Sequence, residues 1–240
     1  QYAIVSEAGA SVYSASKLAS EEFPEYDVNL RSAVSIARRL QDPLAELVKI
    51  DPKAIGIGQY QHDMPPARLD AALAGVVESC VNSVGVDLNT ASPSLLGYIA
   101  GIYAAIAKNI VAYREENGGF TARPQLLKVP KLGKKAYEQC AGFLRISGGK
   151  NPLDATAVHP ESYPIAEGLL TLCGCALTDI GTDKMKELPT LAEKMGYKAL
   201  AQQLSAGEPT VRDIIAELQK PGRDPRESLP PTVLRSDVLE

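Results

Sequence analysis

A spacing of 30 residues in the middle of the chain restricts the possible folds more than any other feature of this sequence. Residues 95–146 contain two segments that match when the second is shifted back by 30 positions. Four anchor positions keep this offset: Gly101 with Lys131, Ile102 with Leu132, Ala107 with Tyr137, and Ile110 with Cys140. A constant offset over four positions indicates a structural repeat.

Each segment has the pattern of two helices joined by a short hairpin. In the second, Val129-Pro130 precedes Lys131-Leu132-Gly133, and a helix with apolar anchors follows. Glycine in such a turn permits a positive φ and close approach of a ligand. The following helix begins with N–H groups that lack partners within the helix, so its start favours an anion. This is the helix-hairpin-helix pattern, and it predicts contact with nucleic-acid phosphates without reading of the bases.

Ten residues of the two hairpins are therefore candidates for nucleic-acid binding. Hairpin one (residues 95–117) is expected to present the backbone amides of Gly101, Ile102 and Tyr103, and hairpin two (residues 123–144) those of Lys131, Leu132 and Gly133. The lysines expected to add a salt-sensitive attraction to phosphate are Lys108, Lys128, Lys131, Lys134 and Lys135. Hairpin one is less regular, because Tyr103 stands where a second glycine is usual. The alternative is that both segments are helical hairpins that bind no ligand.

The distribution of charge supports this location for the site. The chain of 240 residues has a net charge of −4, so it is not basic as a whole. Residues 108–150 nevertheless contain nine basic and three acidic residues, a net charge of +6, which leaves −10 for the rest. The positive charge is thus concentrated on the two hairpins.

The cysteines and the hydropathy indicate a chain without metal and outside the membrane. The sequence has four cysteines, no signal peptide and no long apolar run, so we expect free thiols in the cytoplasm. Cys173 and Cys175 lie near His159, which leaves a zinc site as an alternative. The apolar surroundings and the unusual spacing favour buried structural cysteines instead, with no metal and no cofactor.

Helices dominate the pattern along the remainder of the chain. Apolar residues at helical spacing predict helices that include residues 14–23, 29–40, 66–80 and 210–219, the last capped by Thr210. A strand is predicted at residues 2–6 and a loop at 86–90. One strand with a few helices does not complete an α/β layer, so we expect the chain to begin part-way through a domain. The fold class predicted is mainly α.

Several longer blocks of sequence identify a family. Residues 32–51, 57–63, 85–92, 151–154, 157–163 and 221–226 closely resemble the bacterial Tex transcription accessory proteins. The resemblance implies four regions: the C-terminal part of a YqgF/RNase H-like domain (1–62), a tandem helix-hairpin-helix domain (63–150), a helical linking domain (151–230), and a connector (231–240) to an OB-fold RNA-binding domain. It also implies sequence-independent nucleic-acid binding and a link to the transcription machinery.

Three classes of function are compatible with the sequence. The expected one is non-enzymatic binding of RNA or DNA by a monomer. The second is a scaffold that positions other domains or proteins. The third is a metal-dependent RNase H-like nuclease, for which Glu7 and Asp42 are the candidate carboxylates. Two carboxylates without the first strand of such a domain do not complete a two-metal site, so we expect no catalytic residues.

Overall fold

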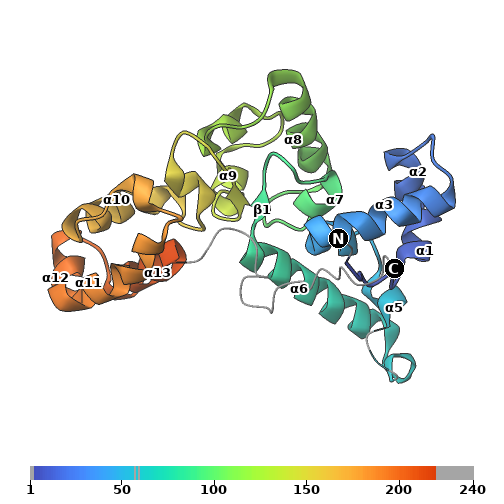
Figure 1. Ribbon diagram of the computed structural model, residues 1–240, viewed down its shortest axis with the longest axis horizontal. Coiled ribbons are helices and arrows are strands. Elements are labelled where there is room, and N and C mark those ends of the chain that lie inside the picture. Colours follow the sequence, from blue (N-terminus) through green and yellow to red (C-terminus); the bar gives the residue numbers. More distant parts are fainter. Residues whose placement is uncertain (1–2, 57, 59, 220–240) are drawn as a thin grey trace, which may run out of the picture. The chain divides into compact units, whose positions relative to one another are not determined.

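The computed structural model describes residues 3–56, 58 and 60–219 of the chain. The chain divides into two compact units, with the boundary between Val81 and Asn82. Helices make up most of both units, which confirms the predicted mainly-α class (Figure 1). The expected connector at residues 231–240 lies outside the described residues.

The N-terminal unit is built of short helices and two longer ones, most of them labelled in Figure 1. Its elements are α1 (Ala10–Ser14), α2 (Lys17–Glu22), α3 (Val28–Gln41), α4 (Pro43–Leu47), α5 (Pro52–Ile55), η1 (Gln61–Asp63) and α6 (Pro66–Val84), which continues past the boundary. The predicted helices at 29–40 and 66–80 are confirmed. A small core forms around Tyr13, Ala19 and Ile50.

Residues 3–6 do not form the predicted strand. Their position is set by a side chain instead, because the buried Arg39 donates from Nη1 to the carbonyl oxygens of Ser6 and Ala8, at 2.8 Å each. A strand needs a neighbouring strand to pair its backbone groups. Within the described part of this unit no such neighbour is present.

The first half of the C-terminal unit contains the two predicted hairpins. Its elements are β1 (Val86–Asp87), α7 (Pro93–Leu96), α8 (Ala104–Asn117), η2 (Arg123–Lys128), α9 (Lys134–Cys140) and β2 (Leu144–Arg145). Ser92 caps α7, accepting from the amide of Leu95 at 3.2 Å. β1 and β2 pair in parallel, with Val86 opposite Leu144, so the expected loop at 86–90 begins as a strand. For the same reason α9 ends at Cys140 and does not reach residue 144.

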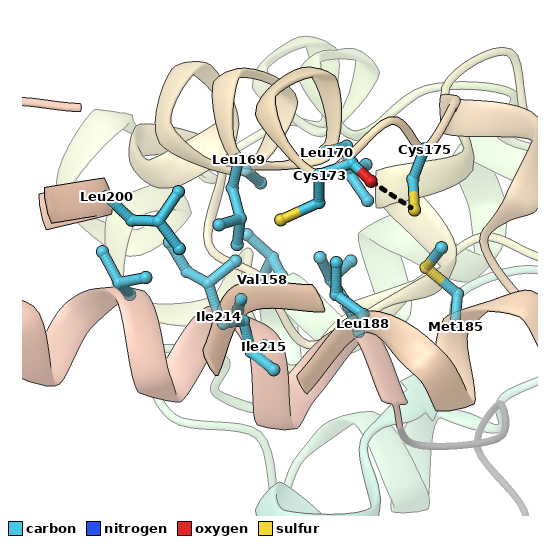
Figure 2. Packing of buried hydrophobic residues seen from close by; sticks show 14 of the residues in the cluster. Val158, Leu169, Leu170, Cys173, Cys175, Met185, Leu188, Leu200, Ile214 and Ile215 are labelled. Atoms are coloured by element: carbon cyan, nitrogen blue, oxygen red, sulfur yellow. Dashed lines mark hydrogen bonds between the residues drawn. The ribbon is translucent and has the colours of Figure 1, made fainter. Parts of the chain in front are cut away.

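The second half of this unit packs around its own hydrophobic cluster. Its elements are η3 (Pro152–Ala155), η4 (Pro160–Ser162), α10 (Tyr163–Leu172), η5 (Leu177–Asp179), η6 (Asp183–Glu187), α11 (Leu188–Met195), α12 (Tyr197–Gln203) and α13 (Glu208–Gln219). Figure 2 shows Leu169, Leu188 and Ile215 from three helices pointing into the same interior. Cys173 and Cys175 are buried in this cluster, and the Cys175 thiol donates to the Cys173 carbonyl, which confirms their structural role.

Candidate nucleic-acid interface

The two hairpins have the same backbone conformation at an offset of 30 residues. Gly101 and Lys131 both have a positive φ, 80° and 68°. Ile102 and Leu132 follow and are buried. Tyr103 and Gly133 then cap α8 and α9 with extended backbones, ψ being 168° and 175°. The repeat inferred from the spacing is therefore present in the structure.

Lys131 occupies a backbone region that usually belongs to glycine. The left-handed region costs a residue with a Cβ roughly 1–2 kcal/mol. Among the described residues, only Lys131 and Ser205 adopt a positive φ without being glycine. Lys131 therefore holds a strained backbone conformation at an exposed turn of hairpin two. Strained residues are often found at binding sites.

The anchors behind each hairpin hold it to the helix that follows. The amide of Ala107 donates to the Tyr103 carbonyl at 3.0 Å, and the amide of Tyr137 donates to the Gly133 carbonyl at the same distance. Behind them Ile110 and Cys140 are completely buried, and burial raises the pKa of the Cys140 thiol to about 12. Tyr137 is half-buried, so the second hairpin has one full anchor where the first has two.

The hairpins pack against each other reciprocally. Asn109 of α8 donates from Nδ2 to the Pro130 carbonyl of hairpin two at 2.7 Å. Gly101 of hairpin one lies so close to α9 that an added Cβ would stand 2.9 Å from the Cβ of Gln139. Asn109 and Gln139 are themselves 30 residues apart. Each turn therefore packs against the helix that follows the other turn, through equivalent residues of the repeat.

Two of the predicted amide donors are already used within the hairpins, so the prediction that these two amides are free for a ligand was wrong. The amide of Ile102 donates to the Ile99 carbonyl at 3.0 Å, and the amide of Leu132 donates to the Val129 carbonyl at 3.1 Å. Both side chains are buried. Ile102 and Leu132 therefore fix the shape of the turns, while in the described part of the chain the exposed Gly133 amide has no acceptor.

The five predicted lysines are exposed and carry their charge into solvent. None of the five lies within ion-pair distance of a carboxylate in the described part of the chain: Lys108, Lys128, Lys131, Lys134 and Lys135. Lys49 of the N-terminal unit shows the contrast, since its buried ammonium bridges Glu22 at 3.0 Å and Glu46 at 2.9 Å. The positive charge on the hairpins remains available to a ligand.

The arginines of the same region serve the fold instead. Arg114 donates from Nη1 to the carbonyls of Leu88 at 3.1 Å and Ala91 at 2.7 Å, and burial lowers its pKa. Arg145 is 5% exposed, and Arg123 is completely buried. Three of the nine cations in residues 108–150 are therefore buried or half-buried, and lysine supplies nearly all of the surface charge.

Arg123 joins hairpin two to the following half of the unit. Its guanidinium donates to the carbonyls of Leu144 at 2.8 Å, Val158 at 2.7 Å and Thr156 at 2.5 Å, and to the hydroxyl of Tyr163 at 2.6 Å. The Tyr163 hydroxyl in turn donates to the buried Asp154 carboxylate at 2.6 Å, and its pKa is raised by burial. No pattern in the sequence around Arg123 indicates this role.

A third hairpin with the same positive φ and anchor spacing lies between α12 and α13. Ser205 has a φ of 49°, Ala206 and Gly207 follow, and α13 begins at Glu208. Val211 and Ile214 are buried at six and nine positions after Ser205, as Ala107 and Ile110 are after Gly101. The predicted helix start at Thr210 was wrong by two residues and concealed this hairpin. The spacing of Gly207, Val211 and Ile214 is the signal that could have found it.

The third hairpin lacks the chemistry that would attract phosphate. Glu208 places a carboxylate in the first turn of α13, where it pairs with Arg212 at 2.7 Å. Pro209 removes one of the N–H groups that a helix start would otherwise offer. Residues 151–219 contain ten acidic and five basic residues. The third hairpin therefore has the turn of the motif but lacks the positive charge of hairpin two.

Of the two candidate carboxylates of a nuclease, one has a structural role. Asp42 caps α4, accepting from the amide of Ala45 at 3.1 Å, and Glu7 is exposed. Among residues 3–56, 58 and 60–219, no group of three or more His, Cys, Asp or Glu side chains is placed to hold a metal ion. His159, the third residue of the zinc alternative, binds the Glu138 carbonyl through Nε2 at 2.9 Å.

The described helices include none with the length and apolar character needed to span a membrane.

Family comparisons match three parts of the chain. Residues 1–41 match a model described as Tex protein YqgF-like domain, residues 81–145 a helix-hairpin-helix motif, and residues 151–226 an HHH domain. The last match agrees with the third hairpin in a region expected only to be a helical linker.

Whole-chain comparisons find relatives in bacteria and in animals. The chain is 58% identical over 231 residues to the transcriptional accessory protein Tex of Neisseria gonorrhoeae, and 59% identical over 234 residues to protein YhgF of Escherichia coli. It is 44% identical over 269 residues to the human S1 RNA-binding domain-containing protein 1. These matches cover 93%, 94% and 92% of this chain but 29%, 28% and 27% of the relatives. The identity over nearly the full chain and the three domain matches place this chain in the Tex family of transcription accessory proteins.

Proposed function

We propose that this chain binds nucleic acid through the phosphate backbone, without sequence preference, as part of a transcription accessory protein. Hairpin two supplies the main contact. Its free Gly133 amide and the exposed Lys131, Lys134 and Lys135 converge on the start of α9. Amides and ammonium groups grip phosphate oxygens but carry no information on the bases.

The observation that carries the proposal is the five exposed lysines without carboxylate partners on two adjacent hairpins. A phosphate that replaces small counterions at such a surface gains affinity from their release. Lys108 and Lys128 extend the same field, with Asn109 and Pro130 joined by a hydrogen bond between them. Family membership supports this proposal, and one relative carries RNA binding in its name.

The test is binding to labelled single- and double-stranded DNA and RNA by fluorescence anisotropy over a salt series. The variant is Lys131→Glu/Lys134→Glu/Lys135→Glu. We expect its affinity to collapse. The slope of log affinity against log salt should become shallower by about one for each phosphate that the variant no longer neutralises.

The control variant carries the same change in net charge away from hairpins one and two. Lys17→Glu/Lys194→Glu/Lys198→Glu replaces three exposed lysines, and we expect binding close to that of the unaltered chain. Equal losses in the two triple variants would assign the effect to overall charge. Undetectable binding by the unaltered chain at low salt would refute the proposal.

A second candidate function, a scaffold for protein partners, is favoured by the acidic character of residues 151–219 and by the Glu208 carboxylate at the third hairpin. Its surface differs from the lysine surface in the sign of its charge, so a partner bound there would not depend on the lysines. Binding of a transcription protein that survives the lysine triple variant would support it.

We also propose that the chain does not cleave nucleic acid. The cap role of Asp42 and the exposed position of Glu7 support this proposal, because a two-metal mechanism needs carboxylates gathered around the ions. Labelled RNA and DNA incubated with the chain and Mg²⁺ or Mn²⁺ should remain intact. Cleavage that a Glu7→Gln/Asp42→Asn variant abolishes would overturn it.

A further inference from the structure

Tyr103 is an exposed aromatic residue at the start of α8, where the equivalent residue of hairpin two is Gly133. Its exposed fraction is 57%, whereas Ile102 and Ile106 on either side are buried. Within the described residues its hydroxyl has no hydrogen-bond partner. The side chain therefore serves neither the core nor a polar network, although an exposed ring this large is unfavourable in water.

Hairpin one, which carries the ring, packs against the lysine-rich hairpin two. Gly101, two residues before it, contacts Gln139 of α9, the helix that follows the lysine-rich turn. Asn109, six residues after it on α8, holds the Pro130 carbonyl of hairpin two. A strand whose phosphates are held by hairpin two therefore has hairpin one beside it.

The difference between the hairpins at this position determines what each can contact. Gly133 has no side chain, and nothing lies within 4 Å of an added Cβ, so a phosphate can approach its backbone closely. At hairpin one the same position carries the exposed Tyr103 ring, which offers a flat π-face instead. Such a face stacks on a nucleobase of any kind, provided that the base is not already stacked within a duplex.

We propose that Tyr103 stacks on an unpaired base of the strand held by hairpin two, which gives the chain a preference for single-stranded or frayed nucleic acid over continuous duplex. This inference rests on the proposed function, because the phosphate contacts must bring the strand to the ring. Hairpin one is then a base-stacking unit, and hairpin two a phosphate-binding unit, on one common backbone.

The experiment compares Tyr103→Ala and Tyr103→Phe with the unaltered chain on three probes. These are single-stranded DNA and single-stranded RNA with one 2-aminopurine, and a blunt DNA duplex. We expect Tyr103→Ala to weaken binding to both single strands about 5- to 100-fold, as for loss of one stacked base, and to leave duplex binding unchanged. Tyr103→Phe retains the ring, so it should keep the affinity and the quenching of 2-aminopurine fluorescence.

The control is Tyr60→Ala, which removes a tyrosine of similar exposure, 68%, from the N-terminal unit. It should bind all three probes like the unaltered chain. Equal affinity of Tyr103→Ala and the unaltered chain for single strands, or equal losses on single strand and duplex, would overturn the stacking role. If the unaltered chain binds no probe at all, the proposed function itself fails. If binding responds to the lysine triple variant but not to Tyr103→Ala, stacking alone fails.

Discussion

Replacement of Arg123 by methionine should destabilise the C-terminal unit strongly. Methionine keeps much of the side-chain volume but donates no hydrogen bond. The carbonyls of Leu144, Thr156 and Val158, all on buried residues, lose their guanidinium donor, and so does the Tyr163 hydroxyl.

Each buried acceptor left unpaired costs about 1–3 kcal/mol. Removal of the Arg123 charge also ends its own desolvation cost, which offsets part of the sum, so we expect a net loss of about 3–5 kcal/mol. This is a large part of the roughly 5–15 kcal/mol by which a domain is usually stable. The basic character of residue 123 would then have little to do with binding and much to do with folding.

The assay is urea unfolding followed by far-ultraviolet circular dichroism, because the chain has no tryptophan. The control is Arg68→Met, which alters an exposed arginine on α6 and should change the free energy of unfolding by less than about 0.5 kcal/mol. A loss below about 1 kcal/mol for Arg123→Met would refute the reasoning, since the buried carbonyls would then have found water or other donors.

Further predictions concern strain, ionisation and the third hairpin. Lys131→Gly should raise the free energy of unfolding by about 1 kcal/mol in urea titration, because its φ of 68° suits glycine, while nucleic-acid affinity falls. Burial raises the pKa of Cys140 to about 12, so its contribution to stability should be complete below pH about 8.5 and decline as pH rises towards 12 in unfolding experiments. Thiol reagent at pH 8 should modify the exposed Cys80 long before Cys140, as peptide mass mapping would show; the reverse order would contradict the assigned burial. Glu208→Lys/Pro209→Ala should increase the salt slope of nucleic-acid binding by about one, and an unchanged slope would show that the missing positive charge is not what keeps the third hairpin from phosphate.

The repeat could be predicted from the sequence because its signal is local. The turn, the buried residue after it and the helix anchors lie within ten positions, so the offset of 30 residues identified both hairpins and the lysines around them. Even the lysine in a glycine position was placed correctly, since the anchors on either side fixed its register.

The remaining features depend on partners that are distant in sequence. Arg123 is one of the nine basic residues counted in residues 108–150, but its acceptors lie at residues 144, 156, 158 and 163, and nothing in its neighbourhood indicates them. Likewise the two-residue strands carry too short a pattern to detect, and their pairing joins residues 58 positions apart. The hydrogen bonds of Ile102 and Leu132 show a further limit, because sequence spacing identifies a turn but not which of its amides remain free.

The parallel pairing of β1 and β2 has a mechanical consequence. The chain enters the hairpin module at Val86 and leaves it at Arg145, and these two ends are joined by bonds from Val86 N to Phe143 O and from Leu88 N to Arg145 O, at 2.8 Å each. Because the strands run in the same direction, tension between the entry and the exit slides one strand along the other and loads these bonds together. Tension along the chain can therefore pass through the paired strands β1 and β2. Both hairpins then bear no load and keep their shape.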